Sequence, residues 1–191
     1  MRGLDVGCGM GRLTFWLAAR MRHVAGLDRD PAAIKEARRL AEQSQLGNID
    51  FIEGDAEREE YVRFSPDMVT AQLCASDAII ERAARALHPG HCLGMVAFHV
   101  DQWKETGKIS RFAYDETRME RSLRSQGFLP EVVEVEREVK RFTSVEEGLA
   151  AAVGLEDAWR ADGRWFRFIA FLEGGGRTLT RAHLIVKARK S

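Results

Sequence analysis

The sequence predicts an α/β protein whose open, doubly wound and mostly parallel sheet carries helices on both faces. Two patterns support this class: short apolar runs alternate with amphipathic helical segments, and a glycine-rich turn follows the first apolar run. The length is a third observation, because 191 residues of which 45% are hydrophobic suit one domain around one core. We therefore expect residues 1–191 to form a single domain.

Each element of the first hundred residues is predicted from its own pattern. Asp30 is expected to cap a helix with Pro31 at its first position, where the missing N–H is not needed. Gly47 suits the left-handed residue after that helix. The predicted elements are strand 4–6, helix 11–20, strand 24–27, a helix from 31 to 47, strand 49–52, strand 67–73, helix 77–87 and strand 92–98.

The last third of the chain has a different pattern. A helix over 115–126 precedes a strand in which valines and glutamates alternate between 133 and 139, and such a strand belongs at or near a sheet edge. Residues 143–176 are expected to form a helical cap inserted before a final strand through 184–186, with a capping box at 144–147. Five strands before Phe98 and two after it fit an open sheet that ends in a hairpin.

The charge balance and the cysteines limit the function classes. Lys and Arg total 29 and Asp and Glu total 29, so broad capture of nucleic acid or of an acidic membrane is disfavoured. The longest clean apolar run, 92–98, is far shorter than the ~20 residues that span a bilayer. Cys8, Cys74 and Cys92 are widely spaced and odd in number, which supports neither a disulfide framework nor a metal site. We expect a soluble cytoplasmic protein without a metal.

The most informative segment is residues 4–11, Leu-Asp-Val-Gly-Cys-Gly-Met-Gly. Glycine at alternate positions lets the backbone turn sharply between strand and helix and lets a ligand approach the main chain. A dinucleotide-binding loop needs a further glycine where this chain has Arg12 or Thr14. Asp5, within the strand, would repel a pyrophosphate but suits a ligand that carries an ammonium and a sulfonium.

Two further acids follow predicted strands. Asp28 ends the second strand, 21 residues beyond Gly7, where a carboxylate can accept both ribose hydroxyls. Asp55 follows the third strand. Because ligands of open α/β sheets bind outside the carboxyl ends of the strands, the loop and both acids are expected to meet in one crevice.

With these motifs in order, residues 3–100 resemble the class I S-adenosylmethionine-dependent methyltransferases. LDVGCGMG is similar to the first motif of that family, and GLD, EGDA, PDMVTAQL and RALHPGHCLGMVAF to later ones. The resemblance implies a seven-stranded sheet with a reversed last strand and S-adenosylmethionine as the cofactor. The residues that it implies are Asp5, Gly7, Cys8 and Gly9 around the methionine part, Asp28 with Arg29 at the ribose, Asp55 and the Ala56 backbone at the adenine, and Gln72 beneath the ligand.

Catalytic residues stay unassigned, because a base is needed only if the acceptor must lose a proton. His99, just past the fifth strand, is the best candidate base, with a hydrogen-bonded or surface histidine as the alternative. Trp103 is interpreted either as a substrate contact or as packing. Four aromatic residues of the cap form either a lid over an apolar acceptor or the core of the cap: Trp159, Trp165, Phe166 and Phe171. Cys74, which follows the fourth strand, is expected near the pocket.

Methyl transfer to a small metabolite is therefore the leading hypothesis, with nucleic acid disfavoured as a partner. The chain begins almost at the first strand, whereas the family usually has helices before it. We expect either a truncated or different start, or a pocket that another subunit or the C-terminal region covers; a homodimer is therefore one alternative. The alternatives are a non-catalytic S-adenosylmethionine-binding protein or partner subunit, and a dinucleotide-dependent oxidoreductase, which the glycine spacing opposes.

Overall fold

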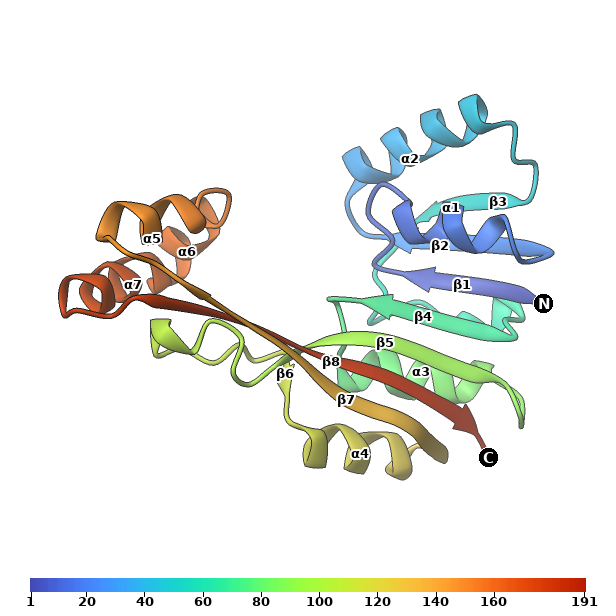
Figure 1. Ribbon diagram of the computed structural model, residues 1–191. Helices are drawn as coiled ribbons and strands as arrows, with labels where there is room; N and C mark the ends of the chain where they lie inside the picture. The colour runs from blue at the N-terminus through green and yellow to red at the C-terminus, as the bar shows by residue number, and fades with distance from the viewer.

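Five parallel strands form the first part of the sheet in the computed structural model, which describes residues 1–191 (Figure 1). Each strand pairs in register with its neighbours, so their carboxyl ends lie along one edge of the sheet. The five are β1 (Arg2–Val6), β2 (His23–Asp28), β3 (Ile49–Glu53), β4 (Met68–Gln72) and β5 (Cys92–His99).

Two long strands complete the sheet in the order β3-β2-β1-β4-β5-β8-β7. β8 (Thr178–Lys190) runs antiparallel to both β5 and β7 (Phe128–Arg141). The predicted α/β class, the mostly parallel sheet and the reversed last strand are therefore confirmed. The alternation of valine and glutamate also correctly predicted an edge strand, since β7 ends the sheet order.

One strand was not predicted. β6 (Ala113–Tyr114) has two residues and pairs parallel to the end of β5, which makes the sheet eight-stranded rather than seven-stranded. Two residues are too few to produce the alternation by which a strand is recognised in a sequence.

Helices pack on both faces of the sheet, as the side chains of β2 show. Val24 packs with Leu17 of α1, whereas Ala25 and Leu27 point to the opposite face and join the main core. Successive side chains of a strand alternate between faces, so α1 and α3 lie on different sides. These helices are α1 (Arg12–Ala18), α2 (Pro31–Ser44), α3 (Asp77–Ala86) and α4 (Glu116–Ser125).

The predicted cap of α2 is correct and its predicted end is not. The Ala32 N–H donates to the Asp30 side chain at 2.9 Å, and Pro31 is the first helical residue. The helix ends at Ser44, and Gln45 takes the left-handed conformation (φ 57°) expected for Gly47. A polar exposed residue can adopt this conformation at a modest cost, so the glycine two positions later did not mark the end.

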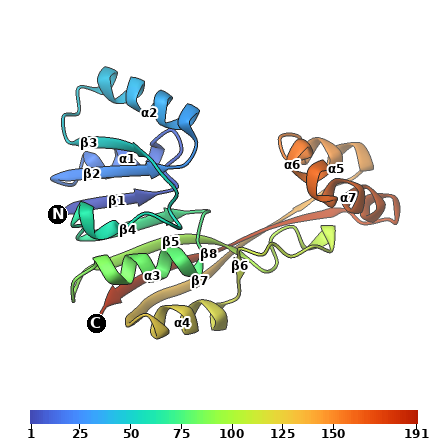
Figure 2. The same ribbon diagram turned by 180° about the vertical axis from the view of Figure 1, so that it is seen from behind.

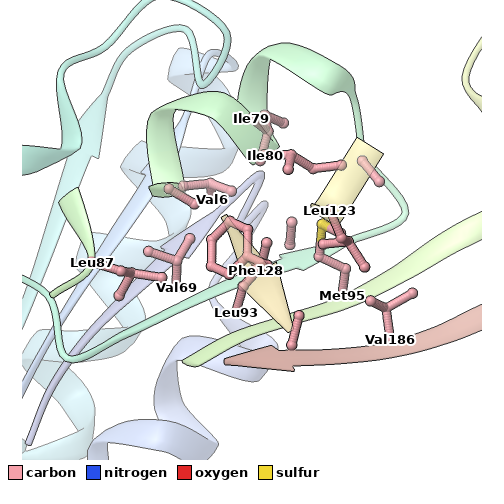
Figure 3. Close-up of a cluster of buried hydrophobic side chains, with 14 of the residues drawn as sticks. Val6, Val69, Ile79, Ile80, Leu87, Leu93, Met95, Leu123, Phe128 and Val186 are labelled. Carbon is pink, nitrogen blue, oxygen red and sulfur yellow. The ribbon is translucent and has the colours of Figure 1, made fainter. Parts of the chain in front are cut away.

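The main core lies between the sheet and the pair α3 and α4. Figure 3 shows Ile79 and Ile80 of α3 in one cluster with Val69, Leu93 and Met95 of the central strands. Leu123 of α4, with Phe128 and Val186 of the antiparallel strands, extends the same cluster. This core holds the strands whose carboxyl ends carry the predicted acids.

Beyond the end of β5, β7 and β8 continue as a two-stranded ribbon that carries three helices (Figures 1 and 2). The helices are α5 (Val145–Ala151), α6 (Glu156–Asp162) and α7 (Arg164–Glu173). They pack around their own buried cluster, which includes Trp159, Trp165 and Phe168. Both views place them apart from α2 and β3.

Two short 3-10 helices, η1 (Tyr61–Phe64) and η2 (Lys104–Thr106), complete the fold. None of the helices combines the length and the apolar character that crossing a membrane requires.

Candidate functional site

A cavity of about 350 Å³ lies at the carboxyl ends of the parallel strands. This is the place at which open α/β sheets bind ligands, and the volume is within the range of small-molecule sites. Six of the nine residues assigned from the sequence line it: Gly7, Asp28, Arg29, Asp55, Ala56 and Gln72.

The glycine loop is shaped by steric limits at two positions. Gly7 has φ +66°, and a Cβ built on it would lie 2.5 Å from the Cys74 Sγ. Gly11 has φ +87°, and its Cβ would lie 2.5 Å from the Phe51 ring. Any side chain there would be strained and would collide with a neighbour, so both positions require glycine.

Asp28 is fixed by the glycine loop and by the turn that follows β2. Its Oδ2 accepts from the Gly9 N–H at 2.8 Å, and its Oδ1 accepts from the Asp30 N–H at 2.9 Å. Each carboxylate oxygen has a second lone pair, so both oxygens can still accept a hydroxyl from a ligand. The two N–H donors therefore orient the carboxylate without using up its capacity.

Asp55 and Ala56 line the cavity from the turn after β3. The Asp55 Oδ1 accepts from the Glu57 N–H at 2.9 Å, and the Ala56 carbonyl accepts from the Tyr61 hydroxyl at 2.6 Å. Gln72, at the end of β4, is exposed and also lines the cavity, on the opposite side of β1 from β3 in the sheet order.

Asp5 is not part of the cavity lining, contrary to expectation. It is 1% exposed, and its two carboxylate oxygens accept from the Thr14 hydroxyl at 2.7 Å and the Thr70 hydroxyl at 2.8 Å. Burial raises the pKa of its carboxyl above the usual 3.8, against the lowering effect of these hydroxyls. Asp5 therefore connects α1 to β4 beneath the glycine loop.

Cys8 and Gly9 also lie outside the lining. The Cys8 side chain packs with Phe51 in the cluster beside α2, and burial raises the pKa of its thiol to about 12. The Gly9 N–H is engaged by Asp28. These residues shape the loop around Gly7 rather than facing the cavity.

Four further residues line the cavity without having been predicted. Leu73 follows β4 with φ 60°, which is unusual for a branched side chain. Phe112 comes from the irregular segment before β6 and is 36% exposed. No periodic pattern marks loop positions such as those of Leu73 and Phe112, so only the tertiary structure identifies them. The four are Glu57, Leu73, Ile79 and Phe112.

Cys74 lines the cavity, as the sequence suggested, but it is not activated as a nucleophile. Its thiol donates to the Val6 carbonyl at 3.2 Å, and burial raises the pKa of the thiol to about 12. A thiol protonated at neutral pH reacts slowly, because the thiolate is the nucleophile.

The interpretation of His99 as a base is not supported. The residue is 5% exposed and does not line the cavity. Its Nδ1 accepts from the Asp101 N–H at 3.1 Å, and its Nε2 lies 3.3 Å from the Glu116 carboxylate. Both ring nitrogens are thus engaged, which agrees with the alternative of a hydrogen-bonded histidine.

Most of the aromatic residues in and near the helical segment pack in its core, and none forms a lid over the cavity. Trp103 lies 5.2 Å from Trp159 between ring centroids, and Trp159 packs on Phe168. Trp165 is buried in the same cluster and Phe171 packs against it, while Phe166 is 61% exposed. None of them lines the cavity.

The ionisable side chains of the lining carry more negative than positive charge. Three carboxylates, of Asp28, Asp55 and Glu57, line the cavity with one guanidinium, that of Arg29. This balance favours a cationic ligand over a phosphate. No group of three or more His, Cys, Asp or Glu side chains is arranged to hold a metal ion.

Two curated proteins are similar to parts of this chain. A probable cobalt-precorrin-6B C(15)-methyltransferase (decarboxylating) from Methanothermobacter thermautotrophicus is 44% identical over 54 residues, which are 28% of this chain and 28% of that protein. An uncharacterized RNA methyltransferase from Halalkalibacterium halodurans is 38% identical over 55 residues, which are 29% of this chain and 12% of that protein. The chain therefore matches only a minor part of the length of these relatives.

A solved structure, that of a putative methyltransferase from Bacillus halodurans, aligns with 99% of this chain and 92% of its own at a TM-score of 0.70. The two sequences are 20% identical, so this likeness concerns the fold. The family model described as "Methyltransferase domain" matches residues 1–148. This match includes the glycine loop and the five parallel strands β1–β5 of the sheet. The chain therefore belongs to the methyltransferase domain family.

Proposed function

We propose that this protein transfers a methyl group from S-adenosylmethionine, bound in the cavity at the carboxyl edge of the sheet, to a small-molecule acceptor. The observation that carries the proposal is that Gly7, Asp28 and Asp55, from three separate strand ends, line a single cavity. Family membership supports the same activity.

The residues of the cavity fit the parts of this cofactor. Each oxygen of the Asp28 carboxylate has a free lone pair for a ribose hydroxyl. Gly7 has no side chain, so the methionine part of the cofactor can lie close to its backbone. Apolar side chains of Ile79 and Phe112 suit the faces of a flat base, and the Asp55 carboxylate can accept a hydrogen bond from the amino group of that base. The excess of carboxylates suits the ammonium and sulfonium groups.

S-adenosylmethionine, when bound, supplies the electrophilic methyl group. The chain contributes orientation, and alignment alone can lower a barrier by roughly 7–11 kcal/mol. The structure assigns no general base, because His99 lies outside the cavity and its ring is engaged. We therefore propose an acceptor whose reacting atom needs no proton removed by a side chain of this cavity.

We infer the class of acceptor from the charges of the cavity and of the whole chain. Three carboxylates at the cavity and an overall net charge of zero disfavour a polyanion, which supports a small molecule. RNA is the second candidate, because relatives that share part of this sequence are named as RNA methyltransferases.

The test is methyl transfer from labelled S-adenosylmethionine to a cell extract separated into a small-molecule filtrate and an RNA fraction. Label in the filtrate that survives ribonuclease treatment is the expected result, and mass spectrometry then identifies the product. Label confined to the RNA fraction would favour the second candidate. Tight binding of S-adenosylhomocysteine without transfer to either fraction would instead indicate a non-catalytic cofactor-binding protein.

A further inference from the structure

The turn between β3 and η1, residues 54–60, is held by two side chains that do not line the cavity themselves. This turn carries Asp55 and Ala56, the two residues that we assign to the adenine base. One of the two side chains is Tyr61, at the start of η1, and the other is Arg82, on α3.

Tyr61 connects the turn to the main core. Its ring is fully buried among the residues of that core, and its hydroxyl donates to the Ala56 carbonyl at 2.6 Å. Burial raises the pKa of the phenol, so it remains a protonated donor at neutral pH. The position of Ala56 is therefore coupled to a side chain that cannot move without disturbing the core.

Arg82 holds the next residues of the same turn from the side of α3. Its guanidinium donates to the Glu57 carbonyl at 2.6 Å and to the Glu59 carbonyl at 3.2 Å, and it pairs with the Glu60 carboxylate at 2.6 Å. The side chain is only 17% exposed. A planar guanidinium with several fixed donors can hold two carbonyls at once, which an ammonium group cannot do with the same geometry.

Within the turn, Asp55 is also hydrogen-bonded to the residues that follow it. The Asp55 carbonyl accepts from the Arg58 and Glu59 N–H groups, each at 2.9 Å, and its Oδ1 accepts from the Glu57 N–H. Movement of the carbonyls at positions 57 and 59 would therefore move the Asp55 carboxylate. Tyr61 holds the turn at Ala56, and Arg82 holds it at Glu57 and Glu59.

We infer that Tyr61 and Arg82 are positioning residues that fix the turn at 54–60 so that the cavity distinguishes adenine from other bases. The inference rests on the proposed function, since it concerns the base of the cofactor. A turn held in place before binding loses little freedom when the ligand arrives, and its carboxylate meets the base amino group at a fixed place. A looser turn binds less tightly and discriminates less between bases.

The experiment compares two variants with two matched controls. Tyr61→Phe removes only the hydroxyl, and Arg82→Lys keeps the charge but loses the two-carbonyl contact. Tyr114→Phe removes another buried tyrosine hydroxyl, which donates to Asp77 rather than to the turn. Arg118→Lys changes an arginine that contacts the Ala113 carbonyl and Asp77.

The ligands are S-adenosylhomocysteine and S-inosylhomocysteine, which has a carbonyl where adenine has its amino group. The wild type is expected to prefer the adenine compound in calorimetric titration, because the Asp55 carboxylate repels a carbonyl oxygen. Each test variant should bind S-adenosylhomocysteine about five- to tenfold more weakly, as expected for a lost hydrogen bond, and should show a smaller preference between the two ligands. The controls should keep the wild-type preference.

Hydrogen exchange of the amides of Glu57, Arg58 and Glu59, measured without ligand, gives a second readout. It should be faster in both test variants and unchanged in both controls. If Tyr61→Phe does not fold, Arg82→Lys carries the test. Unaltered preference and unaltered exchange in variants that bind would overturn this inference alone, whereas a wild type that does not bind S-adenosylhomocysteine would overturn the proposed function with it.

Discussion

The parallel half of the sheet and the helical segment on the β7–β8 ribbon are supported by very different amounts of buried structure. The main core joins 23 buried residues from the sheet, α3 and α4, whereas the cluster under α5–α7 has seven. In the first region, buried side chains pack on both faces of the strands. The helical segment is joined to the rest of the molecule through β7, β8 and the short η2 segment. We therefore expect the helical segment to unfold more easily than the sheet.

The cavity belongs entirely to the first region. Its lining comes from residues 7–112, and no residue of 143–177 takes part. A large aromatic cluster is thus not evidence of a binding site, since in this protein the aromatic residues stabilise a segment far from the lining. The cavity is instead marked by glycine and acidic residues at strand ends. We propose that residues 1–191 act as one methyltransferase domain in which 143–176 is an added helical element.

The largest expected effect is that of Trp159→Ala, which tests whether the two regions are independent. Trp159 is 1% exposed and packs against Trp103 and Phe168. Its removal should cost about 3–5 kcal/mol in the helical segment, as for other buried aromatic residues. Hydrogen exchange should become fast in α5–α7 and stay slow in β1, β4 and β5, and the affinity for S-adenosylhomocysteine should not change.

Phe166→Ala is the matched control, because this side chain is 61% exposed on α7. It should leave exchange in the helices nearly unaltered. If Trp159→Ala also exposed the central strands to exchange, the two regions would unfold as one unit and the comparison would be wrong.

A smaller effect is expected from Asp28→Ala, which acts on the cavity alone. The change removes the acceptor that we propose for the ribose hydroxyls, together with the contacts to Gly9 and Asp30. Charge-assisted hydrogen bonds contribute about 1.5–3 kcal/mol each, so the affinity for S-adenosylhomocysteine should fall at least about tenfold in calorimetric titration. The helical segment should keep its exchange pattern.

Asp50→Ala provides the comparison for that variant. Asp50 lies on β3, contacts His23 and does not line the cavity. Its removal should leave the affinity at the wild-type value. Equal losses in the two variants would contradict the assignment of Asp28 to the ribose.

The smallest effect concerns the acid buried beneath the glycine loop. Burial raises the pKa of Asp5 above 3.8 in the folded protein, so the folded state binds this proton more tightly than the unfolded state. The contribution of Asp5 to stability is therefore greatest at or below pH 3.8 and decreases as the pH rises through the folded pKa. Asp5→Asn, which does not titrate, should lack this decrease.

Urea unfolding of both proteins between about pH 4 and about pH 7 measures the difference, and other titrating groups cancel in the comparison. The stability of the wild type relative to Asp5→Asn should decrease with pH over the lower part of this range and then level off. A relative stability that increased with pH would mean that the hydroxyls of Thr14 and Thr70 outweigh burial.

Much of the cavity was predictable because its markers are local. A turn with glycine at alternate positions, and an acid directly after a strand, can be recognised from neighbouring residues alone. Once the strands are parallel, their carboxyl ends must share one edge, so Gly7, Asp28 and Asp55 had to lie near one another. The conformational limits of glycine and the geometry of parallel strands were sufficient for that part.

The sequence by itself thus determined the class of sheet, its reversed last strand, and the strand ends at which the cavity lies. Only the tertiary structure decided which side chains face that cavity. Register places Asp5 directly beside Thr70, 65 residues away, and so buries an acid that local pattern assigned to the ligand. Phe112 lines the cavity although it belongs to an irregular segment. The ring of His99 is in contact with the Glu116 carboxylate and does not line the cavity. Such contacts depend on packing between segments distant in sequence, for which neighbouring residues carry no signal.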